Sequence, residues 1–187
     1  MRTIAASPLV PFRATPIIKL MCYDALALAG GLHVDWREDR IGAAERGENP
    51  MVLARLRSGY AVLGDTQFLP GYCVLLAAPR VPSLEALSPL RRQDFLLDMS
   101  LIGDALLMAC QPLRINYSIY GNTDHYLHAH VFPRYAWEPA PQVALPVWRY
   151  AAEMWHDPAH TYDPVAHAAL RRMIGEALRR VLHTAYS

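Results

Sequence analysis

Cysteine is scarce in this sequence, with three residues (Cys22, Cys73 and Cys110) in a chain of 187. The number is odd, the spacing is wide and the surroundings are apolar, which does not match the disulfide framework of small secreted domains. A chain of this length most simply makes one domain and buries about 70% of its extended surface without such a staple. We therefore expect reduced core thiols and a cytoplasmic protein.

Long apolar runs and an excess of charge are also missing. No run approaches the ~20 residues of a membrane span, and Pro8, Pro11 and Pro16 interrupt the short apolar patch at the start before a signal-like core develops. The formal net charge of +1 gives no general attraction to nucleic acid or to anionic membranes. We therefore expect neither a nucleic-acid polymer nor a membrane as a partner. The Gly-x-x-x-x-Gly-Lys phosphate loop is absent as well, which argues against the usual kinase or ATPase arrangement.

Turn and capping signals divide the chain into elements. Residues 49–58 predict a short helix, because the first of them is a capping asparagine and Gly59 suits the helix end. The β-rich runs 60–64 and 72–78 flank a Pro-Gly turn and predict two adjacent antiparallel strands. Further along, the spacing of apolar residues predicts a helix between Ser88 and Pro112, strands over 114–121 and 126–132, and a terminal helix from Asp163-Pro164.

The segment 125–135, "HYLHAHVFPRY", places three of the eight histidines in or beside a predicted strand. Alternation gives the strand two faces. One face carries Leu127, Ala129 and Val131 and should meet the core; the other carries Tyr126, His128, His130 and Phe132. His128 and His130 then lie about 6–7 Å apart along the strand. Such a pair suits metal binding, proton transfer or direct attack on an electrophile, or is a solvent-facing pair without a function.

A metal site is the first of these alternatives. Zinc normally takes a third or fourth protein ligand. His125 lies on the wrong side of a regular strand, and Asp124 and Glu138 stand at no familiar ligand spacing. No glutamate follows His130 by three or four residues, which counts against a cupin-like metal enzyme. The sequence therefore predicts no metal ligands.

A nucleophilic histidine is the second alternative, and a family resemblance favours it. The tail "HAHVFPR", His128 to Arg134, resembles the histidine triad (HIT) superfamily of nucleotide hydrolases and transferases, whose motif is His-φ-His-φ-His-φ-φ with φ apolar, commonly followed by Pro-Arg. Residues 68–87 resemble the central strand of that family and the loop that leads to its long helix. The similarity runs from about Arg55 to Tyr135, and bacterial proteins described as diadenosine-polyphosphate hydrolase-like are especially similar.

The resemblance implies a role for each motif position. The nucleophile on the α-phosphorus falls on His128, and the histidine that contacts the phosphate near the leaving group falls on His130. The first triad position is Tyr126, with His125 one residue away, and Tyr72 stands where many members carry a histidine after the Pro-Gly turn. Tyrosine, with an ordinary pKa near 10, donates hydrogen bonds but does not shuttle protons at neutral pH as histidine does near 6.5.

The implied reaction is hydrolysis or transfer at the α-phosphate of a dinucleoside polyphosphate or a nucleoside phosphoramidate, through a nucleotidyl-histidine intermediate. No cofactor is required, although Mg²⁺ can accompany the nucleotide. The alternative is a non-catalytic nucleotide-binding or regulatory protein with a degenerate triad. The residues expected to bind substrate are Asn122, Tyr126, Asp65, Ser118, Arg134 and His125. Asp65 would hold the ribose or stabilise a turn, and Arg134 would meet a phosphate or pair with a local carboxylate.

The expected architecture is α+β, with a HIT-like antiparallel sheet of about five strands, two main helices and a C-terminal helical extension. Residues 1–135 would form the HIT-like domain with an N-terminal extension. Residues 136–187 would wrap around the same domain, with Trp137, Trp148 and Trp155 packed rather than stacked on a base. The resemblance also implies a homodimer.

Overall fold

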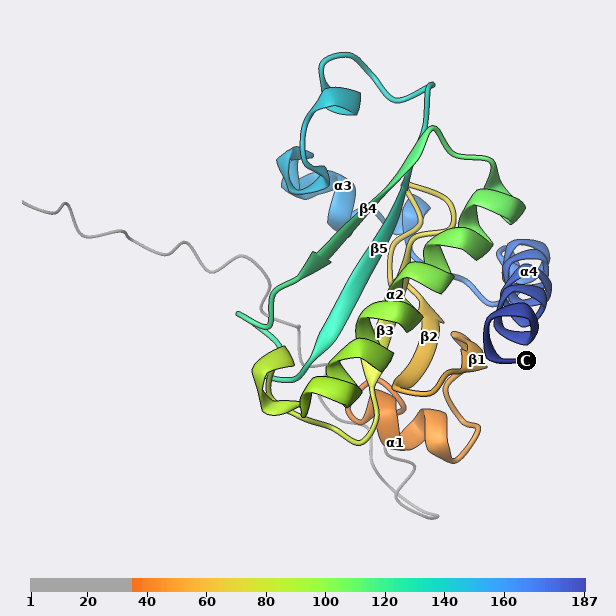
Figure 1. The fold of residues 1–187 in the computed structure, drawn as a ribbon. Helices are drawn as coiled ribbons and strands as arrows, with labels where there is room; N and C mark the ends of the chain where they lie inside the picture. Colours follow the sequence, from red (N-terminus) through yellow and green to blue (C-terminus); the bar gives the residue numbers. More distant parts are fainter. Residues whose placement is uncertain (1–34) are drawn as a thin grey trace, which may run out of the picture. The chain divides into compact units, whose positions relative to one another are not determined.

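The computed structural model describes residues 35–187 (Figure 1), so the predicted N-terminal extension and Cys22 lie outside the described residues. The described part is an α+β unit built on a five-stranded sheet of order β1-β2-β3-β5-β4, and every neighbouring pair of strands is antiparallel. The strands are β1 (Val52–Arg55), β2 (Gly59–Leu63), β3 (Cys73–Ala77), β4 (Arg114–Ile119) and β5 (His128–Arg134). The predicted fold class is confirmed.

The described chain has four α-helices. They are α1 (Arg40–Glu45), α2 (Pro89–Cys110), α3 (Ala152–His156) and α4 (Ala168–Tyr186), with short 3-10 turns at Leu84–Ala86, Gln142–Ala144, Val147–Arg149 and Pro158–His160. The long helices α2 and α4 pack on the face that carries the main core, whereas Trp155 of α3 packs on the other face. Figure 1 shows α2 running along the sheet with α4 beside it, and the two helices contact each other. The Ser88 hydroxyl accepts a hydrogen bond from the Arg91 amide at the start of α2, as the capping signal predicts.

The terminal helix begins later than Asp163-Pro164. The Asp163 carboxylate accepts hydrogen bonds from the amides of Val165 and Ala166, at 2.9 and 2.7 Å, and closes a turn ahead of the helix. The helix itself begins at Ala168. A carboxylate that accepts hydrogen bonds from the next amides is typical of a helix cap, but here it closes a separate turn.

The predicted helix over residues 49–58 is wrong. Val52–Arg55 is the edge strand β1, which pairs with β2 through contacts such as Arg55 opposite Tyr60. The first residue of the segment, Asn49, accepts a hydrogen bond from the Met51 amide and forms a turn, and Gly59 opens β2 instead of closing a helix. A Cβ at Gly59 would lie 1.8 Å from the Leu76 carbonyl oxygen, so the strand pairing itself requires glycine there.

The two faces of β5 are as the alternation predicts. Leu127, Ala129 and Val131 are buried in the main core under α2. Phe132, on the other face, belongs to a second apolar cluster, against which Trp148 and Trp155 from the C-terminal segment pack. Those two tryptophans pack as predicted, whereas the third, Trp137, is 60% exposed.

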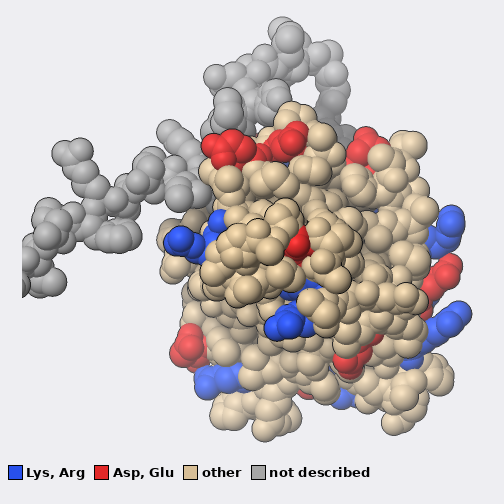
Figure 2. Space-filling model, turned by 90° about the horizontal axis from the view of Figure 1, so that it is seen from above, with Lys and Arg blue, Asp and Glu red and all other residues tan. Residues whose placement is uncertain are grey.

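The face of the molecule drawn in Figure 2 carries no single dominant charge. Figure 2 shows a face that is mostly uncharged, with basic and acidic residues scattered over it and no continuous basic patch. Among residues 35–187, no helix combines the length and the apolar character that crossing a membrane requires.

Candidate active site

His128, the first residue of β5, is held in one tautomer. Its Nδ1 lies 2.9 Å from the Tyr126 carbonyl oxygen. A carbonyl oxygen only accepts hydrogen bonds, so in the neutral ring Nδ1 carries the proton and the lone pair is on Nε2. The residue is 7% exposed. The hydrogen bond therefore orients the ring and selects the tautomer of its neutral form.

His130 follows on the same face, with its ring centroid 4.9 Å from that of His128. The Tyr72 hydroxyl lies 2.6 Å from His130 Nδ1. Burial, and then the neighbouring His128, lower the pKa of His130 to about 3, while burial raises the pKa of Tyr72. Both groups are therefore neutral at pH 7, and the Tyr72 O–H donates to Nδ1. This hydrogen bond leaves the proton of His130 on Nε2, where it forms an N–H donor.

Tyr126 occupies the first position of the motif. Its ring lies 5.1 Å from the His128 ring, centroid to centroid, and the Arg80 guanidinium carbon lies 4.9 Å from the Tyr126 centroid. Burial, and then the nearby Asp124 carboxylate, raise the pKa of Tyr126, so its hydroxyl stays protonated at neutral pH. The tyrosine therefore keeps a hydrogen-bond donor beside the nucleophile position without adding a proton shuttle.

Asp65 binds an arginine that the sequence interpretation missed. Two parallel hydrogen bonds of 2.9 Å join its carboxylate to the guanidinium of Arg40 on α1. Burial acts to lower the pKa of Arg40, but Asp65 outweighs it and raises that pKa. The charges of the pair also act on the pKa values of Tyr72 and Tyr126, so the pair stands close to the histidine strand. Arg40 is 25 positions from Asp65 and outside any motif, and no sequence signal marks it.

The C-terminal segment forms an aromatic wall beside His130. The Trp148 ring meets the His130 ring edge-on at 5.1 Å and stacks on Trp155 at 4.8 Å. Ser118 lies opposite His130 in the β4–β5 register, and its hydroxyl accepts a long hydrogen bond of 3.4 Å from Trp148 Nε1. The structure thus brings Ser118 to the histidines, and gives its hydroxyl a partner in the wall.

Asn122 and His125 lie in the loop between β4 and β5, and both are exposed. Tyr126, at the end of the same loop, is half-buried against His128. The neighbouring residues of the motif therefore differ in their surroundings, and His125 does not take the place of the missing triad histidine on the strand.

Arg134 lies at the far end of β5, apart from this group. Its side chain is 1% exposed, and all five of its N–H groups donate hydrogen bonds inside the protein. The acceptors are the Glu138 carboxylate, the Asn116 side chain and the carbonyls of Gln142 and Leu145. Of the two roles expected from the sequence, the structure therefore shows pairing with a local carboxylate, and no N–H is left for a phosphate.

The carboxylate partner of Arg134 is itself buried. Burial acts to raise the pKa of Glu138, but the hydrogen bonds from Arg134 and Tyr150 outweigh it and lower that pKa. The Tyr150 hydroxyl donates to Glu138 at 2.7 Å. This network attaches the segment after Tyr135 to the end of β5, and thereby fixes the chain that leads to the aromatic wall.

A metal ion would need several ligating side chains close together. In the part of the chain that the structure describes, no group of three or more His, Cys, Asp or Glu side chains stands close enough to hold one ion. The metal alternative for His128 and His130 therefore gains no third ligand from residues 35–187.

Solved structures show what this arrangement is similar to. A histidine triad protein from Sinorhizobium meliloti matches with a TM-score of 0.57 and 23% identity over 71% of this chain and 93% of its own. One from Marinobacter aquaeolei matches with a TM-score of 0.58 and 20% identity over 70% and 89%. A hypothetical histidine triad nucleotide-binding protein from Sulfolobus tokodaii matches with a TM-score of 0.58 and 11% identity over 75% of this chain and 91% of its own. No family model matches the sequence, and no curated protein matches it. At these identities the likeness establishes the fold: the described chain has the fold of histidine triad proteins.

Proposed function

We propose that this protein is a nucleotide hydrolase or nucleotidyl transferase that acts at the α-phosphate through His128. The observation that carries the proposal is the hydrogen bond from His128 Nδ1 to the Tyr126 carbonyl oxygen. It leaves the Nε2 lone pair free for attack, so no base has to remove a proton first. The HIT fold of the chain and the nucleotide-binding neighbour support the same reaction class.

In the proposed reaction, His128 Nε2 bonds to the α-phosphorus while the bond to the leaving oxygen or nitrogen breaks. Water then attacks the phosphorus of the nucleotidyl-histidine and the P–N bond breaks, which returns the lone pair to Nε2. One proton of the water passes to the solvent, and the mononucleotide leaves. His130 donates its Nε2–H to a phosphate oxygen, and the hydroxyls of Tyr126 and Ser118 are further donors for the charge that develops there. Asp65, fixed by Arg40, keeps lone pairs for the ribose hydroxyls. No resident cofactor enters the reaction, and Mg²⁺ would arrive with the nucleotide.

The pKa of His130 bears on the substrate class. A side chain with a pKa of about 3 carries no extra proton at pH 7, so it supplies none to a leaving group. A nucleotide phosphate departs as an anion without a proton, whereas an amine needs one. Dinucleoside polyphosphates are therefore better substrates in this proposal than nucleoside phosphoramidates.

A non-catalytic nucleotide-binding protein is the second candidate. Tyrosines stand at two positions where the resemblance leads one to expect histidines, and burial holds the pKa of both above its ordinary value. Such a site retains donors for phosphate and lacks groups that titrate near pH 7. Binding without turnover is the behaviour that favours this candidate.

The test is to incubate the purified protein with a panel of dinucleoside polyphosphates and an adenosine phosphoramidate, and to measure released mononucleotide. His128→Asn removes the nucleophile and is the central variant; His183→Asn, at an exposed position of α4, is the matched control. Release that His128→Asn abolishes and His183→Asn keeps supports the enzyme. Binding with no release in the unsubstituted protein supports the second candidate, and release that survives His128→Asn contradicts the mechanism.

A homodimer is the assembly we propose. The outer strand β4 has an open edge in the sheet order, and exposed apolar side chains lie on it and on α2. They include Leu97, Leu107, Met108 and Tyr117. Sedimentation velocity at several concentrations measures the mass directly, and a monomer at every concentration would contradict this assembly.

A further inference from the structure

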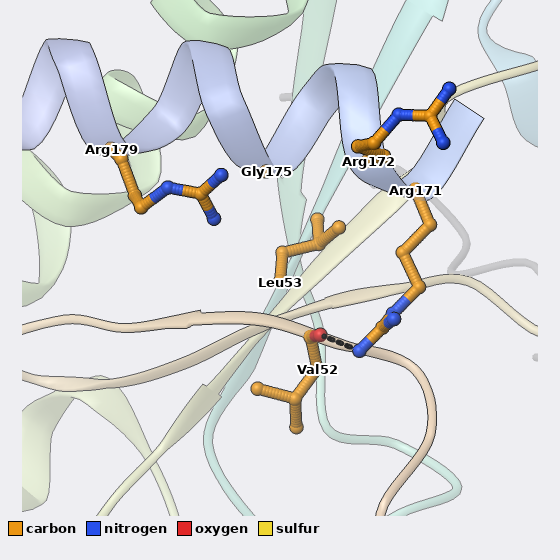
Figure 3. A pocket seen from close by; sticks show the side chains of 6 residues that line it. All are labelled: Val52, Leu53, Arg171, Arg172, Gly175 and Arg179. Atoms are coloured by element: carbon orange, nitrogen blue, oxygen red, sulfur yellow. Dashed lines mark hydrogen bonds between the residues drawn. The ribbon is translucent and has the colours of Figure 1, made fainter. Parts of the chain in front are cut away.

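A hollow lies between α4 and the edge strand β1, away from the histidines. It has a volume of about 310 Å³ and is lined by Val52, Leu53, Arg171, Arg172, Gly175 and Arg179 (Figure 3). That volume is at the lower end of the range of small-molecule pockets, roughly 300–1,000 Å³. In the sheet order β1 is three strands from β5, about 14 Å at the usual strand spacing, so this hollow is separate from the candidate active site.

The charge of the hollow is of one sign. Three of the six lining residues are arginines, and no carboxylate is among them. Within residues 35–187, none of the three arginines forms an ion pair with an acidic side chain. The whole chain has 18 basic and 17 acidic residues, so this is a local excess and does not reflect a basic protein. Arg171 also ends the first turn of α4, where the helix dipole adds positive potential, and Arg172 follows it.

The spacing of these residues makes a notch in the helix. Residues 171, 175 and 179 repeat every four positions and therefore share one side of α4. Figure 3 shows Arg171 and Arg179 extending from the helix toward β1, with Gly175 between them. Arg171 donates to the Val52 carbonyl at 3.1 Å, which fixes one wall of the notch.

Gly175 keeps the notch open. Glycine inside a helix costs about 1 kcal/mol relative to alanine. A Cβ there would meet Arg179 Nη1 at 3.6 Å and the Leu53 carbonyl oxygen at 3.8 Å, which are ordinary contact distances. An alanine at this position would therefore fit without a clash. The glycine leaves that space empty between the guanidinium groups of Arg171 and Arg179.

We propose that this hollow binds a small anion with two or more phosphate groups. Planar guanidinium groups match phosphate oxygens with paired hydrogen bonds, and a phosphate group carries more charge than a single carboxylate. Arg171 and Arg179 start eight residues apart, about 12 Å along the helix. Arg179 Nη1 would lie 3.6 Å from a Cβ at Gly175, whereas Arg171 reaches the Val52 carbonyl, so the two guanidinium groups stand at different places in the hollow and a chain of phosphates offers oxygens to both. This binding site is independent of the reaction proposed at His128.

The test uses inorganic pyrophosphate and tripolyphosphate as probes, with citrate as a multivalent carboxylate for comparison. Nuclear magnetic resonance of the arginine Nε–H groups locates binding, and calorimetry measures affinity. Addition of tripolyphosphate should shift the Nε–H signals of Arg172 and Arg179. Arg172→Gln and Arg179→Gln should each weaken binding about tenfold, the effect of losing one charge-assisted hydrogen bond. Arg171 is left unchanged because it also bonds β1.

Two matched variants make the outcome decisive. Arg180→Gln removes the same charge from α4 at a residue outside the hollow and should leave affinity within about twofold. Gly175→Ala should raise the unfolding temperature and weaken binding, because it fills the notch. Unshifted signals of Arg172 and Arg179, equal loss with Arg180→Gln, or citrate binding as tight as tripolyphosphate would each overturn the proposal. The shifts of the Arg172 and Arg179 Nε–H signals report on this hollow alone, so they distinguish binding here from any binding of the probes at His128.

Discussion

The two ends of β5 use polar side chains in opposite ways. At its end, the Arg134 guanidinium donates all five of its N–H groups to protein acceptors and is 1% exposed. At its start, the His128 ring donates one proton to a backbone carbonyl and keeps a lone pair on the other nitrogen. The side chain with all its hydrogen bonds satisfied and the one with a free lone pair are six positions apart on the same strand.

The difference indicates that Arg134 contributes mainly to stability, whereas His128 is available for chemistry. A buried charged side chain whose hydrogen bonds are all made within the protein has no donor free for a ligand. If its partner is removed, the charge stays buried without compensation and the folded state is strongly destabilised. A buried ring with one unmatched nitrogen contributes less to stability and can react. The two motif residues His128 and Arg134 therefore differ in the part each plays, although they belong to one run of sequence.

The largest expected effect is on catalysis at the histidine end. His128→Asn should lower nucleotide release by at least about a thousandfold, as loss of a nucleophile does in other enzymes. The free energy of unfolding should change by less than about 1 kcal/mol, because one hydrogen bond to a carbonyl is lost. Activity assays and urea unfolding measure the two quantities. A large fall in the stability of His128→Asn would contradict the contrast between the two ends of β5.

The opposite pattern is expected at the arginine end. Glu138→Ala leaves the buried Arg134 without its carboxylate and should lower the free energy of unfolding by about 3–5 kcal/mol. Activity per folded molecule should fall far less than in His128→Asn, when it is measured at a temperature well below the unfolding midpoint of the variant. Glu153→Ala, at an exposed glutamate of the same C-terminal segment, is the control and should change stability by less than about 0.5 kcal/mol.

The two ends should also respond to different pH ranges. The folded pKa of His130 is lowered to about 3, so below its unfolded value near 6.5 the unfolded chain binds a proton that the folded chain does not. Stability should therefore fall with decreasing pH, by about 1.4 kcal/mol per unit while that difference is one proton. The Glu138 contribution is present above about pH 4.3 and is lost as pH falls through its lowered folded pKa. In urea unfolding at a series of pH values, His130→Gln should lose the dependence of stability on pH below about 6.5 that comes from His130. Glu138→Gln should lose the dependence below about pH 4.3 that comes from Glu138.

The smallest expected effect concerns Tyr72. Tyr72→Phe removes the donor to His130 Nδ1 and should lower stability by about 1 kcal/mol. It also frees the His130 proton to occupy Nδ1, so kcat should fall by up to about tenfold with a smaller change in KM. Tyr72→His places a ring nitrogen near the same atom and is the rescue variant. Equal activity of Tyr72→Phe and the unsubstituted protein would show that the tautomer of His130 does not matter.

Local patterns in the sequence predict much of this fold. Alternation in 126–132 assigns the two faces of β5, and the Ser88 cap with apolar spacing predicts α2. Residues 49–58 fail because their capping signals are local, whereas the pairing of β1 with β2 and the close approach of Gly59 to Leu76 are not. A short segment between two turns takes the conformation that its neighbours in space require.

The candidate site is less predictable, because its hydrogen bonds join distant residues. The motif marks His128 and His130, but the Tyr72 hydroxyl that orients His130 is 58 positions away. Arg40 reaches Asp65 from a separate helix, and nothing in its own surroundings in the sequence marks it. Arg134 shows the converse, because its four-residue spacing to Glu138 is visible in the sequence while the saturation of its guanidinium is not.

The aromatic wall has a consequence for the order in which the protein is made. Translation proceeds from the N-terminus, so β5 leaves the ribosome before Trp148 and Trp155 have been added. Until then Phe132 and the ring of His130 lack their cover, and the nascent chain exposes an apolar strand face. The candidate site thus becomes complete late in synthesis, and a chain that stops at Tyr135 would expose an apolar surface where the aromatic wall should pack.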